Sequence, residues 1–118
     1  MKYYKFKKQV WYGRMDKYVP ITDAETEKAY GFLRRAVDIH GEHKEIWVPK
    51  SICKVEDVET DTKTVDVFQG VEYVHNTLHI ITFYIPKWFF GKNRLYITIG
   101  ELVSQNNCYD LEEVELED

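Results

Sequence analysis

The segment that most constrains the fold is residues 77–85, TLHIITFYI, because β-branched and aromatic residues fill almost the whole run. Such a run is typical of a β-strand. Residues 2–12 (KYYKFKKQVWY) mix aromatic and β-branched residues with lysine, which is common on sheet edges, and they predict an early strand. Further strands are predicted at residues 45–48, 64–68, 95–99 and 101–107, with a polar connection at 56–61. The chain is therefore expected to be all-β.

Residues 22–38 are compatible with two structures. Thr22 and Glu25 fit a helical capping box, and the apolar residues from Ala29 to Val37 fall on one helical face. A turn at residues 40–43 (HGEH) instead joins this segment to the strand at 45–48, as in a hairpin. We favour the hairpin, with a strand at about 27–38 in which Gly31 is a bulge or a coil point.

One short helix completes the predicted elements. In residues 86–91 (PKWFFG), proline stands at the first position of a helical turn and glycine at its end. About five strands and one such turn predict a small barrel or sandwich.

Charge is distributed unevenly along the 118 residues, a length that suits one domain. The net charge is −4, but the first 17 residues hold six bases and one acid. Residues 1–109 carry a net charge of +2 and are expected to form the folded domain. Residues 110–118 have too few apolar side chains to pack and are expected to form a flexible acidic tail. Its acids are Asp110, Glu112, Glu113, Glu115, Glu117 and Asp118.

The sequence shows no catalytic or cofactor signature: GxxxxGK[ST], GxGxxG, GxSxG and HExxH are all absent. His75 and His79 lie four residues apart, about 13 Å on a strand, which is too far for one metal ion. The acids at positions 57, 59, 61 and 66 alternate with polar and β-branched residues, as on a solvated strand face. Cys53 and Cys108 form no CxxC pair and are expected to be free thiols. No enzyme, metal or cofactor is predicted.

A binding surface is what remains. Aromatic residues make up 15% of the chain, and they repeatedly stand beside lysine or arginine. Rings that stack on bases and cations that contact phosphates are the two requirements of single-stranded nucleic-acid binding. The predicted stacking residues are Trp11, Tyr30, Phe32, Trp47 and Trp88. The predicted phosphate contacts are Lys7, Lys8, Arg14, Arg34, Arg35, Lys50 and Lys87.

Three segments also resemble a known family: TEKAYGFLRRA (26–36), EIWVPKSICKVED (45–57) and YIPKWFFGKN (84–93). They are similar to the small single-stranded DNA-binding proteins of lactococcal-type phages. The resemblance implies an OB-fold-like five-stranded barrel that self-associates and coats DNA during phage replication and recombination. Bacterial proteins of this class end in Pro-Phe after the acids, whereas this chain ends Leu116-Glu117-Asp118, which puts docking to host proteins in doubt.

These observations predict a sequence-independent single-stranded DNA-binding protein that forms a dimer or tetramer. Recombination or replication proteins would dock on the acidic tail. No run of apolar residues is long enough to span a membrane, and the charged start does not look like a secretory signal. The cytoplasm, of an infected bacterial host if the chain is phage-encoded, is therefore the expected location. The main alternative is an interaction module, or an inhibitor of a host defence nuclease whose acids imitate phosphates; a small metal-dependent nuclease is a third.

Overall fold

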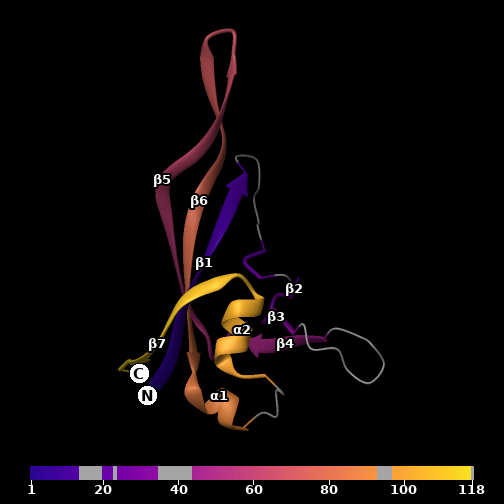
Figure 1. Cartoon of the computed structure of the whole chain (residues 1–118), viewed down its shortest axis with the longest axis vertical. Coiled ribbons are helices and arrows are strands. Elements are labelled where there is room, and N and C mark those ends of the chain that lie inside the picture. The colour runs from indigo at the N-terminus through magenta and orange to yellow at the C-terminus, as the bar shows by residue number, and fades with distance from the viewer. Residues whose placement is uncertain (14–19, 23, 35–43, 93–96, 118) are drawn as a thin grey trace.

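The computed structural model describes residues 1–13, 20–22, 24–34, 44–92 and 97–117. Within these ranges the chain is mostly β, with two short helices (Figure 1), and the expected all-β character is confirmed apart from the second helix. The elements are β1 (Lys2–Gly13), β2 (Ala24–Glu25), β3 (Ala29–Arg34), β4 (Lys44–Pro49), β5 (Lys54–Phe68), β6 (Val71–Pro86), α1 (Lys87–Lys92), α2 (Ile99–Gln105) and β7 (Cys108–Glu115).

Four strands form the larger sheet, in the order β5-β6-β1-β7, and all neighbours are antiparallel. The strands predicted at residues 2–12 and 77–85 are its two central strands, β1 and β6. They pair without a register shift from Tyr3↔Pro86 to Gly13↔Asn76. Because side chains alternate between faces, this register fixes which residues of the two strands lie side by side.

The smaller sheet has the order β2-β3-β4. β3 and β4 pair antiparallel from Ala29↔Pro49 to Arg34↔Lys44, so the hairpin interpretation is confirmed over the helix. The expected bulge at Gly31 is wrong, because the register passes through this residue without a shift. A Cβ there would lie 2.6 Å from the backbone oxygen of Ala24 and 2.9 Å from the Trp47 ring. Gly31 is therefore needed for close packing.

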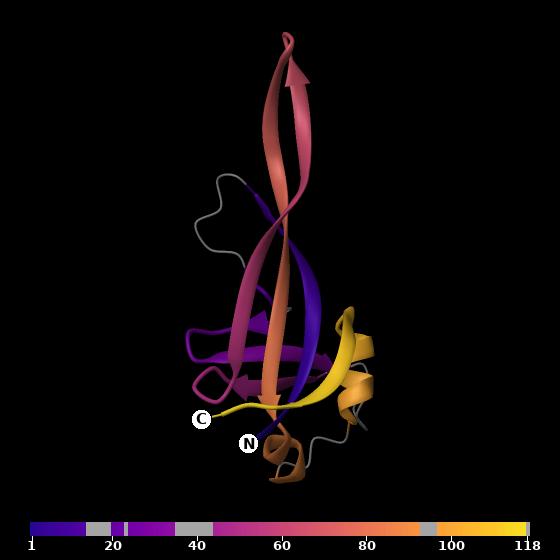
Figure 2. The same cartoon turned by 90° about the vertical axis from the view of Figure 1, so that its left-hand side faces the viewer.

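The two sheets share one core, and the chain forms two sheets rather than one closed barrel in the described residues. Figure 2 shows the smaller sheet crossing one face of the larger sheet. At the contact the rings of Phe6 and Phe83 stack with centroids 5.3 Å apart. The Phe32 ring of β3 meets both edge-on, at 5.9 Å and 5.4 Å. This aromatic cluster joins the sheets.

The C-terminal third differs from the expectations. The helical turn predicted at residues 86–91 is confirmed as α1, but residues 101–107 form α2 and a turn where a strand was expected. The strand expected at 95–99 falls partly outside the described residues, and Ile99 already begins α2. Thr98 caps this helix, because its Oγ1 accepts a hydrogen bond from the backbone N–H of Glu101 and donates one to the Glu101 carboxylate, both at 3.1 Å.

α2 is tied to the smaller sheet by a buried side chain that follows it. Asn106 accepts a hydrogen bond from the backbone N–H of Leu33 at 2.7 Å and donates one to the Leu33 carbonyl at 3.0 Å. Leu102 and Val103 of α2 belong to the shared core. No helix in the described part of the chain is long and apolar enough to cross a membrane.

The segment expected to be a flexible tail is instead ordered as β7, which pairs with β1 from Lys2↔Glu115 to Lys8↔Cys108. The prediction overlooked what lies opposite these acids. β1 carries four lysines, so cross-strand pairing brings opposite charges together. Glu112 lies 3.4 Å from Lys5, and Met1 and Leu116 exchange two hydrogen bonds of 3.0 Å. Asp118 lies outside the described residues.

β5 and β6 continue past the end of β1 as a two-stranded arm, which we define as residues 64–76. The arm projects beyond the other described elements (Figures 1 and 2). The connection expected at residues 56–61 is part of β5, which is continuous from Lys54 to Phe68. Gln69 (φ 51°) and Gly70 (φ 78°) form the two-residue turn at the tip. Two positive φ values match a type I′ hairpin turn and fix the pairing of Phe68 with Val71.

Candidate nucleic-acid interface

The face of the larger sheet that points away from the smaller sheet is called the outer face here. Phe6 points into the core, so the residues of opposite parity on β1 point outward. These outward residues include Lys5, Lys7 and Trp11. The register places Tyr84 of β6 beside Lys5, and Lys54 of β5 beside Tyr84. Residues distant in sequence therefore form one row of cations and rings.

Two lysines of this face lie over tyrosine rings. The Lys5 ammonium is 5.9 Å from the centroid of the Tyr84 ring, and the Lys54 ammonium is 5.0 Å from that of Tyr3. Both rings are buried, whereas Lys54 is exposed and Lys5 half-buried. The rings hold the ammonium groups near the surface by cation–π attraction. This arrangement suits phosphate contact, but it leaves neither ring open to a base.

Two tryptophans supply exposed rings on this side of the molecule. Trp11 is 45% exposed and stands on β1 opposite Leu78. Trp88 is 40% exposed and lines a pocket of about 290 Å³ that also touches Tyr3, Cys53 and Lys54. The pocket therefore borders the row of cations at one end, and Trp11 borders it at the other.

A second hollow lies along the edge of the outer face, between β1 and β7. It measures about 270 Å³ and is lined by Lys5, Lys7, Asp110, Leu111 and Glu112. The register of β1 with β7 shifts between Lys5 and Lys7, and Asp110 has a positive φ of 56°. This bulge opens the space beside the two lysines.

Carboxylates of β7 form ion pairs with two lysines near this surface, Lys5 and Lys87. Besides the pair of Glu112 with Lys5, Glu113 accepts a hydrogen bond from Lys87 at 3.0 Å. This hydrogen bond is the largest cause of the raised pKa of Lys87. Both pairs are partly exposed, so solvent screens them and each holds its lysine only weakly. Lys87 lies over the ring of Tyr4, which shares the parity of Phe6, so only the Lys5 pair belongs to the outer face.

The Cys53 thiol in the Trp88 pocket is not activated as a nucleophile. Burial raises the pKa of Cys53 to about 12, so the thiolate is a minor species near neutral pH. Both cysteines are free, as expected. Cys53 thus contributes shape to the pocket rather than a nucleophile.

Phe32 is the predicted stacking residue that the structure excludes. Its side chain is 1% exposed and lies in the core against Phe6 and Phe83. Tyr30 and Phe32 lie on one face of β3, and this face is turned towards the larger sheet. The Tyr30 ring accordingly meets Phe83 edge-on at 5.7 Å. No base can reach Phe32 in the folded chain.

Tyr30 and Lys50 lie together, but beside a buried acid. The Lys50 ammonium is 4.9 Å from the Tyr30 centroid and 3.6 Å from Glu25 Oε2. The Glu25 side chain is 3% exposed, and its Oε1 is buried without a hydrogen-bond partner. Lys50 therefore compensates a buried charge, and its removal would leave that carboxylate unpaired. The structure assigns Lys50 a structural contact.

The remaining predicted residues are dispersed. Trp47 is 44% exposed, but it lies over Gly31 on the far face of the smaller sheet, away from Trp11. Lys8 shares the parity of the core residues and is half-buried, and the Nε of Arg34 is buried without a partner. Arg14 and Arg35 lie outside the described residues. The outer face thus unites Lys7, Trp11 and, at its end, Trp88.

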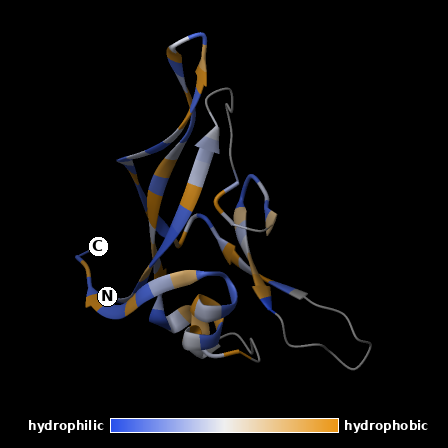
Figure 3. Cartoon of the chain, turned by 45° about the horizontal axis from the view of Figure 1, so that its top comes forward, coloured by the Kyte–Doolittle hydropathy of each residue, from blue (hydrophilic) through white to orange (hydrophobic). Residues whose placement is uncertain are grey.

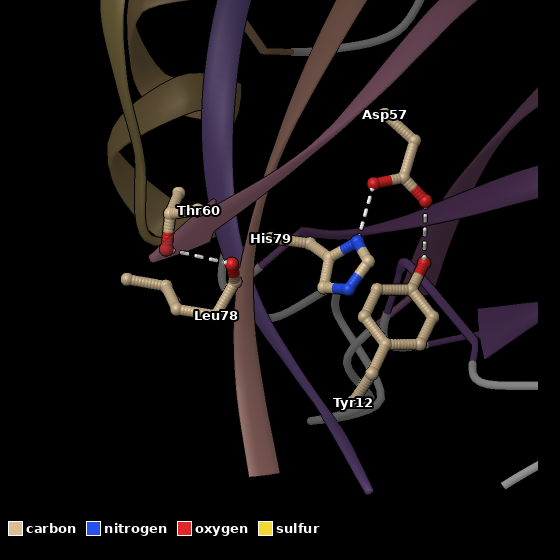
Figure 4. A network of polar contacts seen from close by, with 5 residues as sticks. All are labelled: Tyr12, Asp57, Thr60, Leu78 and His79. Carbon is tan, nitrogen blue, oxygen red and sulfur yellow. Dashed lines mark hydrogen bonds and ion pairs between the residues drawn. The ribbon is translucent and has the colours of Figure 1, made fainter. Parts of the chain in front are cut away.

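A polar network lies on the inner side of the larger sheet, where three strands meet (Figure 4). Asp57 accepts a hydrogen bond from the hydroxyl of Tyr12 at 3.3 Å, and its other oxygen lies 2.6 Å from Nδ1 of His79. The rings of Tyr12 and His79 are 4.1 Å apart. Nearby, Thr60 donates a hydrogen bond of 2.9 Å to the Leu78 carbonyl, where the register of β5 shifts. The network ties β1, β5 and β6 together.

The two strand histidines have separate partners. His79 contacts Asp57, while His75 lies 3.6 Å from Asp66 on the arm. In the described ranges no three His, Cys, Asp or Glu side chains are grouped so that they could hold a metal ion. The acids of β5 are spread along the strand, from the network to the arm.

Sequence reasoning missed four residues of the outer face: Tyr3, Lys5, Lys54 and Tyr84. Tyr3 and Lys5 belong to the strand predicted at residues 2–12 and Tyr84 to the strand predicted at 77–85, whereas Lys54 lies outside the predicted strands. The shared signal of Lys54 and Tyr84 is the pairing of β5 with β6, because Lys54↔Tyr84 is one register pair. That pairing is not readable from either segment alone.

The chain was also compared with protein-family models, with curated proteins and with solved structures, and none of the three comparisons gave a match.

Proposed function

We propose that this chain binds single-stranded DNA without sequence preference along the outer face of its larger sheet. The observation that supports this most directly is that Lys5, Lys7 and Lys54 share that face, with an exposed tryptophan at each end of the row. The lysines would contact phosphates, while Trp11 and Trp88 would stack on bases. A base stacked on an aromatic ring contributes about 1–3 kcal/mol and needs no particular sequence.

The role that the family resemblance implies, coating DNA during phage replication and recombination, is part of this proposal. A closed OB-like barrel is not needed for it, because an open sheet presents the same alternation of rings and cations. The proposed protein partners would meet the exposed carboxylates of β7, held on an ordered strand.

β7 has a second role in this proposal. Glu112 forms an ion pair with Lys5 on the outer face, so DNA must displace this carboxylate to reach the lysine. The neighbouring strand thus competes with DNA for Lys5. Because the pair is partly exposed, it would weaken DNA binding without preventing it.

Tryptophan fluorescence tests the proposal, because the chain has three tryptophans and only two lie beside the outer face. Oligo-dT should quench the wild-type protein and the Trp47→Phe variant by a similar amount, since Trp47 is on the far side. Trp88→Phe should lose part of the quench, and the Trp11→Phe/Trp88→Phe double variant nearly all of it. Quenching that depends on Trp47 instead would place the interface elsewhere, and no quenching even at low salt would overturn DNA binding.

Salt dependence tests the lysines separately. Each phosphate contact releases counterions, so Lys5→Gln with Lys54→Gln should lower the slope of log affinity against log salt by about 2. Lys28→Gln with Lys63→Gln is the matched control, because it also removes two charges, one beside the smaller sheet and one at the root of the arm, both away from this face. Equal slopes in the two proteins would exclude phosphate contact at Lys5 and Lys54.

One observation favours a second candidate function. The acids at the C-terminus are fixed on β7 rather than mobile, and fixed carboxylates are what an inhibitor that imitates phosphates would require. Such a protein would bind a basic enzyme and leave oligo-dT alone. The fluorescence titration therefore separates the two functions.

A further inference from the structure

The arm at residues 64–76 exposes apolar side chains on both of its faces. Val67 is 67% exposed and Phe68 is 64% exposed; Val65, Val71 and Tyr73 are exposed as well. The register places Val65 opposite Val74, on the face that Val67 also occupies, and Phe68 opposite Val71 on the other face. Figure 3 shows hydrophobic residues alternating with hydrophilic ones up to the tip.

In the arm, the larger sheet is reduced to the two strands β5 and β6. β1 ends at Gly13, which pairs with Asn76, and beyond this point β6 has only β5 as a described neighbour. A two-stranded hairpin without a third strand or a packed face is marginally stable in water. Exposed apolar side chains that cluster in this way usually mark an interaction site.

We propose that the arm is a self-association device, and that its occupant is the arm of a second copy of this chain. Its composition fits this occupant. Six of the ten residues at 65–74 are apolar and only Asp66 and Glu72 are charged, and homodimer interfaces are more apolar than interfaces between exchanging partners.

Charge selects the orientation of the two arms. The register puts Glu72 on the face of Val67, and Asp66 on the face of Phe68 and Tyr73, so each face carries one carboxylate near the tip. Parallel arms would bring these like charges together. Antiparallel arms, with each tip against the root of the other, separate the carboxylates and bring Glu72 towards Lys63 of the second copy. Such an arrangement has the two-fold symmetry of a closed dimer.

This inference goes beyond DNA binding and does not depend on it. The turn at Gln69 and Gly70 fixes the register of each arm, so the same apolar face is presented by every copy. If DNA also binds, a dimer joins two outer faces, and the second face then binds at a raised local concentration.

Sedimentation equilibrium without nucleic acid tests the proposal. The wild-type chain should show twice the monomer mass, and the Val67→Lys/Phe68→Lys variant, with one charge added to each face of the arm, should show the monomer mass. Val58→Lys is the matched control: Val58 is 58% exposed and stands on the same strand outside the arm, so this variant should remain a dimer. A far-ultraviolet circular dichroism spectrum like that of the wild type shows that each variant is folded.

Three results would overturn the proposal. A wild-type chain that stays monomeric at every concentration has no self-association to explain. A dimer that survives the double arm variant uses another surface. A dimer that is lost equally in the arm variant and in Val58→Lys responds to charge in general rather than to the arm. Hydrogen exchange of the wild-type arm provides a second measurement that needs no variant: its amides should become more protected as protein concentration rises, and unchanged protection would also overturn the proposal.

Discussion

Tyr12 makes the free energy of unfolding depend on pH in alkaline solution. Burial, together with the charge and the hydrogen bond of Asp57, raises the pKa of Tyr12 from 10.0 to about 12. Above pH 10 an unfolded chain loses this proton, whereas the folded chain keeps it until about pH 12. The contribution of Tyr12 to stability is therefore complete below pH 10 and is lost as the pH rises through that window.

We predict that the free energy of unfolding of the wild-type chain falls more steeply between pH 10 and about 12 than that of Tyr12→Phe, which has no such proton. Urea unfolding of both proteins across the window measures the difference. Tyr73→Phe removes an exposed phenol from the arm and should behave like the wild type. Identical pH profiles for Tyr12→Phe and the wild type would show that the folded state does not hold this proton more tightly.

Single residues also show where sequence reasoning reaches its limit. Tyr30 and Phe32 lie on one face of β3, because side chains of a strand alternate strictly. Which of the two faces becomes the core is decided by the partner sheet, and nothing within residues 29–34 records that choice. Phe32 was therefore assigned to DNA although it is buried, and Trp47 was grouped with Trp11 although the two lie on opposite sides.

Among the elements, β7 departs most from its prediction, and for a physical reason. The acids of residues 110–118 have few apolar neighbours in the sequence, which predicted a flexible tail. In the fold, β1 from the other end of the chain places lysines across the strand pair from these acids. α2 is a different case, because Thr98 and Glu101 have the spacing of a capping box and begin a helix where strands were expected. The strands β1 and β6 were predictable, since composition alone identifies them.

β7 also changes how its effect on DNA binding should be tested. Truncation after Tyr109 would remove most of a paired strand, so a change in affinity would be confounded by a change in fold. Glu112→Gln removes only the charge that faces Lys5, 3.4 Å away. The pair is exposed and worth about 1 kcal/mol or less, so we predict an affinity for oligo-dT raised up to about fivefold.

A fluorescence titration at low salt measures this effect, with Glu117→Gln as the control. This variant also removes one negative charge, but Glu117 lies beyond the end of β7. Equal gains in both variants would mean that net charge, and not the release of Lys5, sets the affinity.

At the scale of the whole molecule, the separation of charge along the sequence becomes charge pairing in space. The basic start and the acidic end of the chain are neighbouring strands of one sheet. Most of the acids beyond residue 109, which give the chain its net charge of −4, therefore lie beside lysines and not in a separate tail. Among the described residues, the two sheets meet at the aromatic cluster of Phe6, Phe32 and Phe83. The stability of the molecule and its proposed DNA contacts consequently reside in different residues.

Phe32→Ala tests this division of roles. Phe32 is 1% exposed and joins the two sheets, so its truncation should lower the free energy of unfolding by about 3–5 kcal/mol, as measured by chemical denaturation. Val58→Ala, which shortens an exposed side chain, should change it by about 0.5 kcal/mol or less. Under conditions where Phe32→Ala is still folded, its affinity for oligo-dT should equal that of the wild type, because the Phe32 ring lies in the core between the two sheets and not on the outer face. A variant with unchanged stability but lost affinity would return Phe32 to the binding surface and would contradict the packing of the two sheets.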